Sequence, residues 1–275
     1  MDIIASFGLK GGIGKTTSVI NYAAAFSFLG KNTLIIDVDD NAAINKILSP
    51  QDQVIKTELF ITDLLLDSQL SPKPFIKTHT GSTSTKKYPQ KTISFDYIPA
   101  SRTENEIFDQ KLIANRLDFK KEFLFKNLIQ KIQEIKPYDI IIFDVSPVAS
   151  TLTRLALLLC DGVIINSRLS KHETKYSIDE TIECLNDFSE SINRRIAILG
   201  IQFNAIRKNV PTEMERFTQA KFLYESPIFL PVPVSILLSE LEEKTIFEIS
   251  SATELIDIYI ENSKHILNIL KTRKY

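Results

Sequence analysis

Glycine is concentrated near the amino terminus of this chain, where four of its eight glycines fall within seven consecutive residues: Gly8, Gly11, Gly12 and Gly14. An apolar run over 3–7 precedes them, and apolar residues at helical spacing follow over 19–29, so we expect a strand-to-helix turn. Glycine accepts positive φ and lets the backbone pass close to a ligand, so successive N–H groups can point into one concavity. Because the next helix adds its free N–H groups and its dipole, the stretch predicts a phosphate-binding loop.

The residues of this loop have separate predicted roles. We expect the backbone of Gly11, Gly12, Ile13 and Gly14 to surround the phosphates of a ligand. Lys15 would reach the β and γ phosphates, the Thr16 hydroxyl would coordinate Mg²⁺, and Thr17 would bond the α phosphate. The alternative is a glycine-rich turn before an ordinary helix.

The loop departs from the general phosphate-loop pattern at its start. Leu9 stands where that pattern has its first glycine, and Lys10 follows it. The string KGGIGKTT over 10–17 resembles the deviant Walker A box of the ParA/MinD ATPases, most closely that of small ParA/Soj-type DNA-partition ATPases without an amino-terminal helix-turn-helix domain. In that family a signature lysine crosses a dimer interface to the partner's nucleotide. The resemblance therefore implies an ATP-dependent homodimer in which Lys10 is catalytic together with Lys15.

The rest of the chain reads as strands that alternate with helices. Buried strands are expected over 33–39, 93–100, 139–144, 161–166, 196–204 and 228–233, and helices over 58–66, 119–135, 173–192 and 253–271. This order indicates an α/β fold with a doubly wound, mostly parallel sheet flanked by helices. Together with the glycine loop, this order predicts the P-loop NTPase fold. We expect residues 1–275 to form a single domain.

Two carboxylates end the second predicted strand. Asp37 and Asp39 alternate along it, so they share a face, and ligands of such sheets bind at the carboxyl ends of the strands. We expect Asp37 to hold the metal's water shell and Asp39 to orient an attacking water. Asp39 is similar to the family's hydrolysis-linked aspartate, but Asp40 and Asn41 replace its usual proline and glutamine. The alternative role for Asp39, Asp40 or Asn41 is to cap a following helix.

A third carboxylate follows the apolar run over 140–143. Asp144 ends this predicted central strand, which is where a Walker B aspartate organises the water around magnesium. Asp144 and Pro147 are similar to the family's pattern, whereas Ser146 replaces a proline. The predicted Mg²⁺ ligands are therefore Thr16, Asp37 and Asp144.

Residues 68–95 carry five lysines and no acidic side chain, with a Thr- and Ser-rich centre. We expect a mobile surface loop here. Its lysines either contact a phosphate backbone or are solvated by chance.

Two residues near the carboxyl terminus are assigned from the resemblance alone. It implies that Asn204 reads the adenine base and that the backbone after Pro231 packs against the base. The last helix ends in basic residues at Lys271, Arg273 and Lys274. That helix either binds a membrane, as in MinD-like proteins, or packs on the sheet.

Composition limits the choice of partners. The net charge is −1, so any contact with nucleic acid must come from local patches. The candidate DNA contacts, each alternatively a solvated charge, are Arg194, Arg195, Arg207, Lys208 and Arg216. The amino terminus leads directly into a strand and no apolar run approaches membrane-spanning length, so we expect a cytoplasmic protein.

The leading hypothesis is a DNA-partition ATPase for plasmid or chromosome segregation. The ATP-bound dimer would bind DNA without sequence preference at the nucleoid, and slow hydrolysis, stimulated by a ParB-like centromere-binding protein or another partner, would reset it. One alternative is a MinD-like positioning ATPase that acts on a membrane or on protein assemblies. Another is a metabolic or metal-delivery ATPase of the same fold.

Overall fold

The computed structural model describes residues 1–49, 61–100, 121–147, 150–169, 174–239 and 241–273, together with 106, 108 and 110. The strands are β1 (Asp2–Phe7), β2 (Thr33–Asp37), β3 (Lys77–Ser84), β4 (Pro89–Ile98), β5 (Ile140–Asp144), β6 (Gly162–Arg168) and β7 (Ala197–Asn204). The helices are α1 (Lys15–Phe28), α2 (Ala43–Leu48), α3 (Ile61–Leu66), η2 (Lys73–Phe75), α5 (Lys121–Ile135), α6 (Thr151–Leu159), α7 (Thr174–Ser191), α8 (Pro211–Leu223), α9 (Ile236–Ser239), η3 (Ile246–Glu248) and α10 (Thr253–Thr272).

The strands form one seven-stranded sheet in the order β3-β4-β2-β5-β1-β6-β7. All neighbouring strands run parallel except β3 and β4, which pair antiparallel at one edge. The α/β fold with a mostly parallel, doubly wound sheet is therefore confirmed. This strand order brings the carboxyl ends of β1, β2 and β5 together at the centre of the sheet, where ligands bind in folds of this type.

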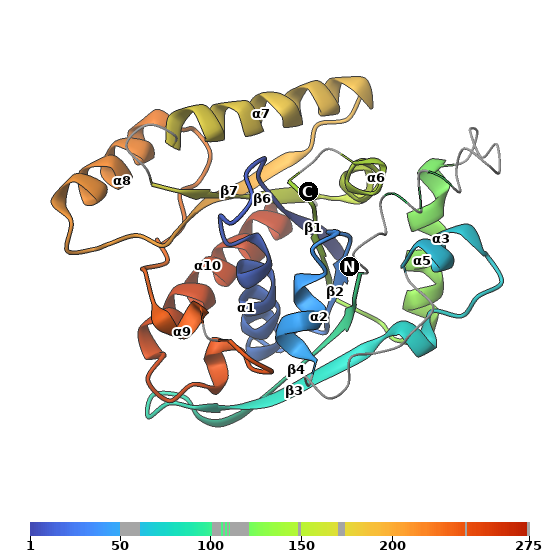
Figure 1. The fold of residues 1–275 in the computed structure, drawn as a ribbon, viewed down its shortest axis with the longest axis horizontal. Helices are drawn as coiled ribbons and strands as arrows, with labels where there is room; N and C mark the ends of the chain where they lie inside the picture. The colour runs from blue at the N-terminus through green and yellow to red at the C-terminus, as the bar shows by residue number, and fades with distance from the viewer. Residues whose placement is uncertain are drawn as a thin grey trace.

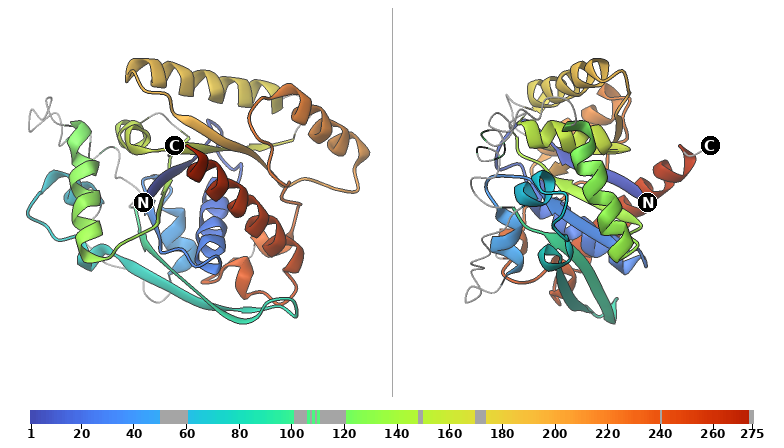
Figure 2. Two further views of the ribbon diagram at one scale, coloured as in Figure 1. Left: turned by 180° about the vertical axis from the view of Figure 1, so that it is seen from behind. Right: turned by 90° about the vertical axis from the view of Figure 1, so that its right-hand side faces the viewer.

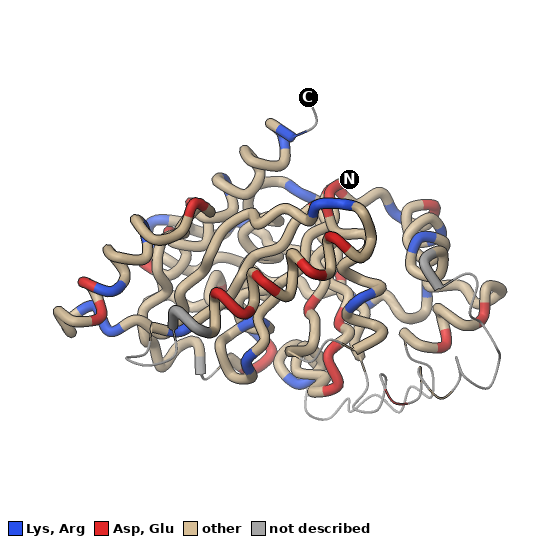
Figure 3. The backbone as a smooth tube through the Cα atoms, turned by 90° about the horizontal axis from the view of Figure 1, so that it is seen from above, with Lys and Arg blue, Asp and Glu red and all other residues tan. Residues whose placement is uncertain are grey.

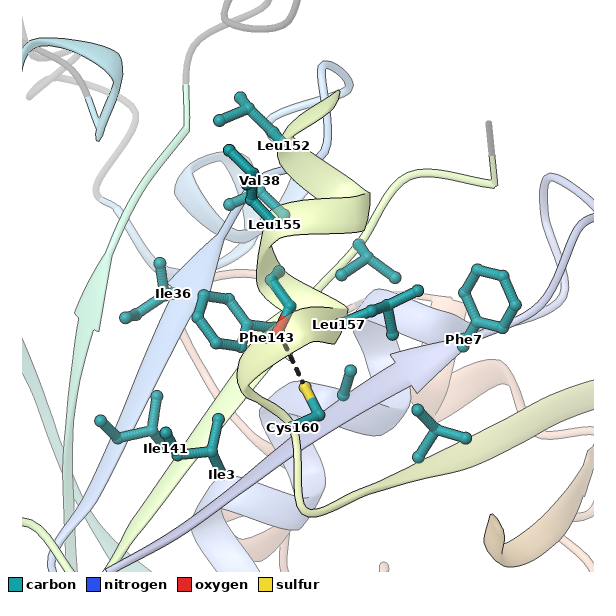
Figure 4. Close-up of a cluster of buried hydrophobic side chains, with 14 of the residues drawn as sticks. Ile3, Phe7, Ile36, Val38, Ile141, Phe143, Leu152, Leu155, Leu157 and Cys160 are labelled. Atoms are coloured by element: carbon teal, nitrogen blue, oxygen red, sulfur yellow. Dashed lines mark hydrogen bonds between the residues drawn. The ribbon is translucent and has the colours of Figure 1, made fainter. Parts of the chain in front are cut away.

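Helices cover both faces of the sheet (Figures 1 and 2). The central strands are apolar on both sides, so successive residues of β2 enter different cores: Ile35 joins the cluster under α1 and α10, and Ile36 the cluster under α5, α6 and α7. Figure 4 shows part of the second cluster, in which Leu155 and Leu157 of α6 pack over Phe143 of β5.

The prediction of a mobile surface loop over 68–95 is wrong for most of its length. Within it the structure has η2, all of β3 and the first part of β4, which form a hairpin along the edge of the sheet (Figure 1). The side chains of β3 alternate between solvent and core, with His79 and Thr83 buried. Because these inward residues are polar, hydrophobic periodicity did not reveal the strand.

The hairpin is held by a segment far away in the sequence. His79 Nε2 lies 2.9 Å from Glu248 Oε2 in η3, and the Ser84 hydroxyl donates to the Glu248 carbonyl at 2.9 Å. A Cβ at Gly81 would lie 2.3 Å from Glu248 Cδ, so only glycine permits this approach. Lys87 pairs with Asp257 of α10, so this lysine of the basic stretch has a partner within the chain.

The last helix, α10, packs on the sheet, which is one of the two alternatives considered for it; the other was binding to a membrane. Its apolar side chains Leu255, Ile258, Tyr259, Ile266 and Leu270 are buried. The segment predicted as a strand over 228–233 is not a regular strand; it forms isolated bridges, from Ile228 to Ile201 of β7 and from Pro233 to Ile206 just after β7. No helix in the described part of the chain is long and apolar enough to cross a membrane.

Most of the remaining predicted elements are confirmed with shifts of a few residues at their ends. Parts of the predictions fall outside the described residues: 58–60 and 119–120 at the starts of two helices, residue 173, and Lys274 of the basic tail.

Candidate active site

The glycine-rich loop connects β1 to α1, as its sequence predicts. Gly12 and Gly14 have φ of 69° and 89°, and Gly14 directly precedes the first residue of α1. A Cβ at Gly14 would lie 3.0 Å from Asn204 Nδ2, so both the backbone conformation and the available space favour glycine. The first turn of α1 contains no acidic residue, and its free N–H groups therefore favour an anion.

Lys15 is buried, with only 6% of its surface exposed. Its Nζ donates to the carbonyls of Gly8 at 3.3 Å and Lys10 at 3.0 Å, so the ammonium group lies against the loop. Burial lowers the pKa of Lys15, while the carboxylates of Asp144 and Asp39 act in the opposite direction. A cation is thus held beside the loop and close to two carboxylates.

Asp37 and Asp144 end neighbouring strands and are direct partners in the β2–β5 register. Both are completely buried. Burial raises the pKa of Asp144 to about 7, against the opposing effect of the Thr16 hydroxyl. Burial also raises the pKa of Asp37, and the charge of Asp144 raises it further. Two carboxylates that repel each other in a buried position need a cation to remain ionised.

The oxygens of these carboxylates fit a metal ion. Among the described residues, no hydrogen bond of ordinary length and angle reaches Asp37 Oδ2 or either carboxylate oxygen of Asp144, although the Thr16 hydroxyl is near enough to act on the pKa of Asp144. Buried polar atoms are normally paired, so unpaired carboxylate oxygens indicate a missing ligand. Carboxylate and hydroxyl oxygens are suitable ligands for Mg²⁺. Asp37, Asp144 and Thr16 therefore fit the predicted ion by their chemistry.

Asp39 lies in the turn after β2. Its backbone N–H donates to Asp37 Oδ1 at 3.0 Å, and its own Oδ1 accepts from the backbone and side-chain nitrogens of Asn41 at 3.1 and 3.0 Å. The capping alternative is not observed, because the cap residue of α2 is Ala42, with no side-chain hydrogen bond. Asn41, which replaces the family's glutamine, thus orients the carboxylate of Asp39.

A cavity of about 340 Å³ adjoins the loop. Its lining includes Gly14, Thr17, Asn204, Pro233 and Tyr259. Asn204, the residue predicted to read the adenine base, is thus among the residues that line this cavity. Pro233, and not the predicted Pro231, is among the residues that line the cavity. The roles predicted for Asn204 and Pro231 at the adenine base stay predictions.

The sequence analysis did not include two residues that the structure places at this site, one that lines the cavity and one that bonds to Asn204. Tyr259 of α10 lines the cavity. Asn166 of β6 lies beneath the loop and bonds to Asn204. Asn166 ends an apolar run just as Asp37 and Asp144 do, and that signal could have identified it.

Most of the candidate DNA-binding residues have partners within the chain. Arg194 donates to the carbonyls of Leu157 and Leu158. Arg207 pairs with Glu213, and Lys208 with Glu254. Acidic residues are spaced along α7 (Figure 3), so this face repels a phosphate backbone. The assignment of the five basic residues to DNA binding stays a prediction.

Comparisons with known proteins give both relatives and structural neighbours. The model of a protein family described as AAA domain matches residues 1–198. The chain is 26% identical over 281 residues to the uncharacterized protein MJECL24 of Methanocaldococcus jannaschii, covering 96% of this chain and 100% of that protein.

Two solved structures have a similar fold. A plasmid partition protein from Borrelia burgdorferi B31, bound to AMPPNP, has a TM-score of 0.69 at 23% identity over 98% of both chains. Cobyrinic acid a,c-diamide synthase from Mycobacterium smegmatis, with an ATP analogue and magnesium, has a TM-score of 0.73 at 18% identity, covering 98% of this chain and 96% of that one.

Proposed function

Because the chain belongs to the AAA-domain family of ParA/Soj-like P-loop ATPases, we propose that it is a magnesium-dependent ATPase that drives DNA partition. The proposal rests above all on the unpaired, buried oxygens of Asp37 and Asp144 beside the Lys15 loop. Such an arrangement is costly in a protein that binds no cation. Structural relatives that hold AMPPNP, or an ATP analogue with magnesium, support the choice of ligand.

In this proposal the loop binds the triphosphate. The backbone N–H groups of 11–14 and the start of α1 accept the phosphates, with Lys15 at the β and γ phosphates and Thr17 at the α phosphate. Thr16, Asp37 and Asp144 hold the magnesium ion. When bound, magnesium neutralises charge on the β and γ phosphates.

Hydrolysis then needs an oriented water. Asp39, held by Asn41, places the water so that its oxygen bonds to the γ phosphorus while the bond to the bridging β–γ oxygen breaks, which gives ADP and phosphate. Lys10 from the second subunit and Lys15 stabilise the charge that develops. Turnover is slow without a stimulating protein.

The proposed cargo is DNA. Residues 1–275 would act as a single ATPase domain whose ATP-bound homodimer binds DNA without sequence preference at the nucleoid, in the cytoplasm. A ParB-like centromere-binding protein would stimulate release. The relation to a plasmid partition protein supports this cargo. A membrane cargo has less support, because the apolar side of α10 is already buried.

The test compares the wild type, Lys10→Ala and Lys264→Ala by sedimentation and by a DNA-shift assay of arbitrary sequence, each with ATP, ADP or no nucleotide. Lys264 serves as the matched control because it lies exposed on α10 and pairs with its neighbour Glu261. We expect the wild type and Lys264→Ala to dimerise and shift DNA with ATP alone, and Lys10→Ala to do neither.

Two results would contradict the proposal. If the wild type stays monomeric with ATP, the proposed ATP-dependent dimerisation is rejected. If ATP produces dimers that do not bind DNA, ATP-dependent dimerisation is retained, but the cargo is a membrane or another protein and not DNA.

A further inference from the structure

The side-chain amide nitrogen of Asn204 forms a hydrogen bond to the glycine-rich loop. Asn204 Nδ2 lies 2.9 Å from the Ile13 carbonyl and 2.9 Å from Asn166 Oδ1, and both atoms accept from it. An amide nitrogen carries two hydrogens, so these two acceptors use both of them. The carbonyl oxygen is therefore the polar atom of Asn204 that a ligand in the adjoining cavity can use.

The orientation of Asn166 is fixed in turn. Its Nδ2 donates to the Ser6 hydroxyl at 2.9 Å, and a longer contact of 3.4 Å runs to the Ile164 carbonyl. Since the nitrogen of Asn166 faces Ser6, its oxygen faces Asn204. The chain of contacts crosses from β1 through β6 to β7, and all three polar side chains are at least 94% buried. Water therefore has little access to these side chains and cannot readily replace one of their hydrogen bonds.

We infer that Asn166, held by Ser6, is a positioning residue that makes this site select adenine nucleotides. The inference rests on the proposed function, in which the nucleoside occupies the cavity lined by Asn204, Pro233 and Tyr259. With its amide held in this orientation, Asn204 presents an acceptor to the base. Asn166 itself does not line that cavity, so it acts only through Asn204.

The chemistry of the bases decides the preference. Adenine carries an exocyclic amino group, a donor, where guanine carries a carbonyl oxygen, an acceptor. A fixed acceptor on Asn204 pairs with the first and opposes the second. Buried polar groups that meet no complementary partner are penalised, which is the strongest source of selectivity available to a site of this kind. If the amide could turn over freely, it would serve either base.

The experiment measures dissociation constants for AMPPNP and GMPPNP, with magnesium, for the wild type and four variants. Asn166→Leu removes one of the two acceptors that hold Asn204 Nδ2 and leaves only the Ile13 carbonyl of that pair, so the amide turns more readily and we expect the preference for AMPPNP over GMPPNP to fall about tenfold. Ser6→Ala frees Asn166 to turn and should give a smaller fall in the same direction. The ratio of two constants on one protein does not change when part of the sample is unfolded.

Two variants serve as controls. Asn166→Asp keeps an acceptor oxygen toward Asn204, and the Ser6 hydroxyl can donate to it, so the wild-type preference should be retained. Asn268→Leu makes the same change as Asn166→Leu at an exposed position of α10 and should leave the preference unaltered.

The outcomes separate this inference from the proposed function. Loss of preference in Asn166→Leu with retention in Asn166→Asp supports it. A wild type that binds both nucleotides equally, or an Asn166→Leu variant that keeps the full preference, overturns it and leaves the ATPase proposal intact. A wild type that binds neither nucleotide overturns the ATPase proposal and this inference with it.

Discussion

Two buried carboxylate sites in the same sheet differ in how they are satisfied. Asp96 of β4 is 2% exposed and accepts from Lys136 Nζ at 2.7 Å, the Tyr138 hydroxyl at 2.6 Å and the Thr78 hydroxyl at 2.7 Å. Asp144 of β5 is equally buried, but neither of its carboxylate oxygens has a hydrogen-bond partner among the described residues.

The two sites also have opposite pKa shifts. Burial alone raises the pKa of Asp96, but the hydrogen bonds from Lys136, Tyr138 and Thr78 outweigh it, so the pKa falls below its usual range. Burial raises the pKa of Asp144 to about 7. Asp96 is therefore a completed structural site that joins the hairpin to the segment between α5 and β5. Asp144 is incomplete without a ligand, as expected of a site whose ionised form is needed only when a cation is bound.

The largest expected effect is on turnover. Asp144→Asn should lower the rate of magnesium-dependent ATP hydrolysis about 100- to 1,000-fold, because it removes a charge required around the phosphates. Phosphate release at saturating ATP measures this rate. The same isosteric change at Asp96, away from the loop, should leave the rate close to that of the wild type. Equal losses in both variants would mean that the two sites do not differ in function.

A smaller effect is expected on stability, in the reverse order. Asp96→Asn should lower the free energy of unfolding by about 2–3 kcal/mol, because the amide cannot accept from all of its three donors. Asp144→Asn should raise the free energy of unfolding of the nucleotide-free protein, because it removes a carboxylate whose burial costs more than its attraction to Lys15 returns. Urea denaturation at pH 8 in EDTA measures both. A destabilised Asp144→Asn variant would show that Asp144 also has a structural role.

The smallest of the three effects is a pH dependence. Between about pH 3.8 and 7 the folded protein holds a proton on Asp144 that the unfolded chain releases, so stability falls as pH rises. This group should lower the free energy of unfolding of the nucleotide-free protein by about 2 kcal/mol between pH 5 and 7.

The pH dependence also distinguishes the two sites. Asp144→Asn should remove that part of the slope. Asp96 contributes stability above its unfolded pKa of 3.8 and loses it only at lower pH, so Asp96→Asn should keep the slope. Denaturation curves at four pH values in EDTA suffice, and an unchanged slope in Asp144→Asn would reject the assignment.

The sequence by itself determined the centre of the molecule. The glycine loop, its strand and its helix are local, because backbone conformation and apolar periodicity are properties of neighbouring residues. The adjacency of Asp37 and Asp144 also followed, since parallel strands place their carboxyl ends at one edge. These inferences needed no knowledge of which distant side chains meet.

Only the tertiary structure decided the rest, because the deciding contacts join residues far apart in the chain. The 68–95 stretch reads as a loop from its Ser and Thr content, yet it forms strands because Glu248, Asp257 and Asp96 satisfy the side chains of His79, Lys87 and Thr78. Likewise, Asn204 bonds to the loop and to Asn166 through one amide group, and Pro233 rather than Pro231 lines the cavity. Burial and hydrogen-bond pairing of polar groups depend on what packs against them, and no local pattern contains that information.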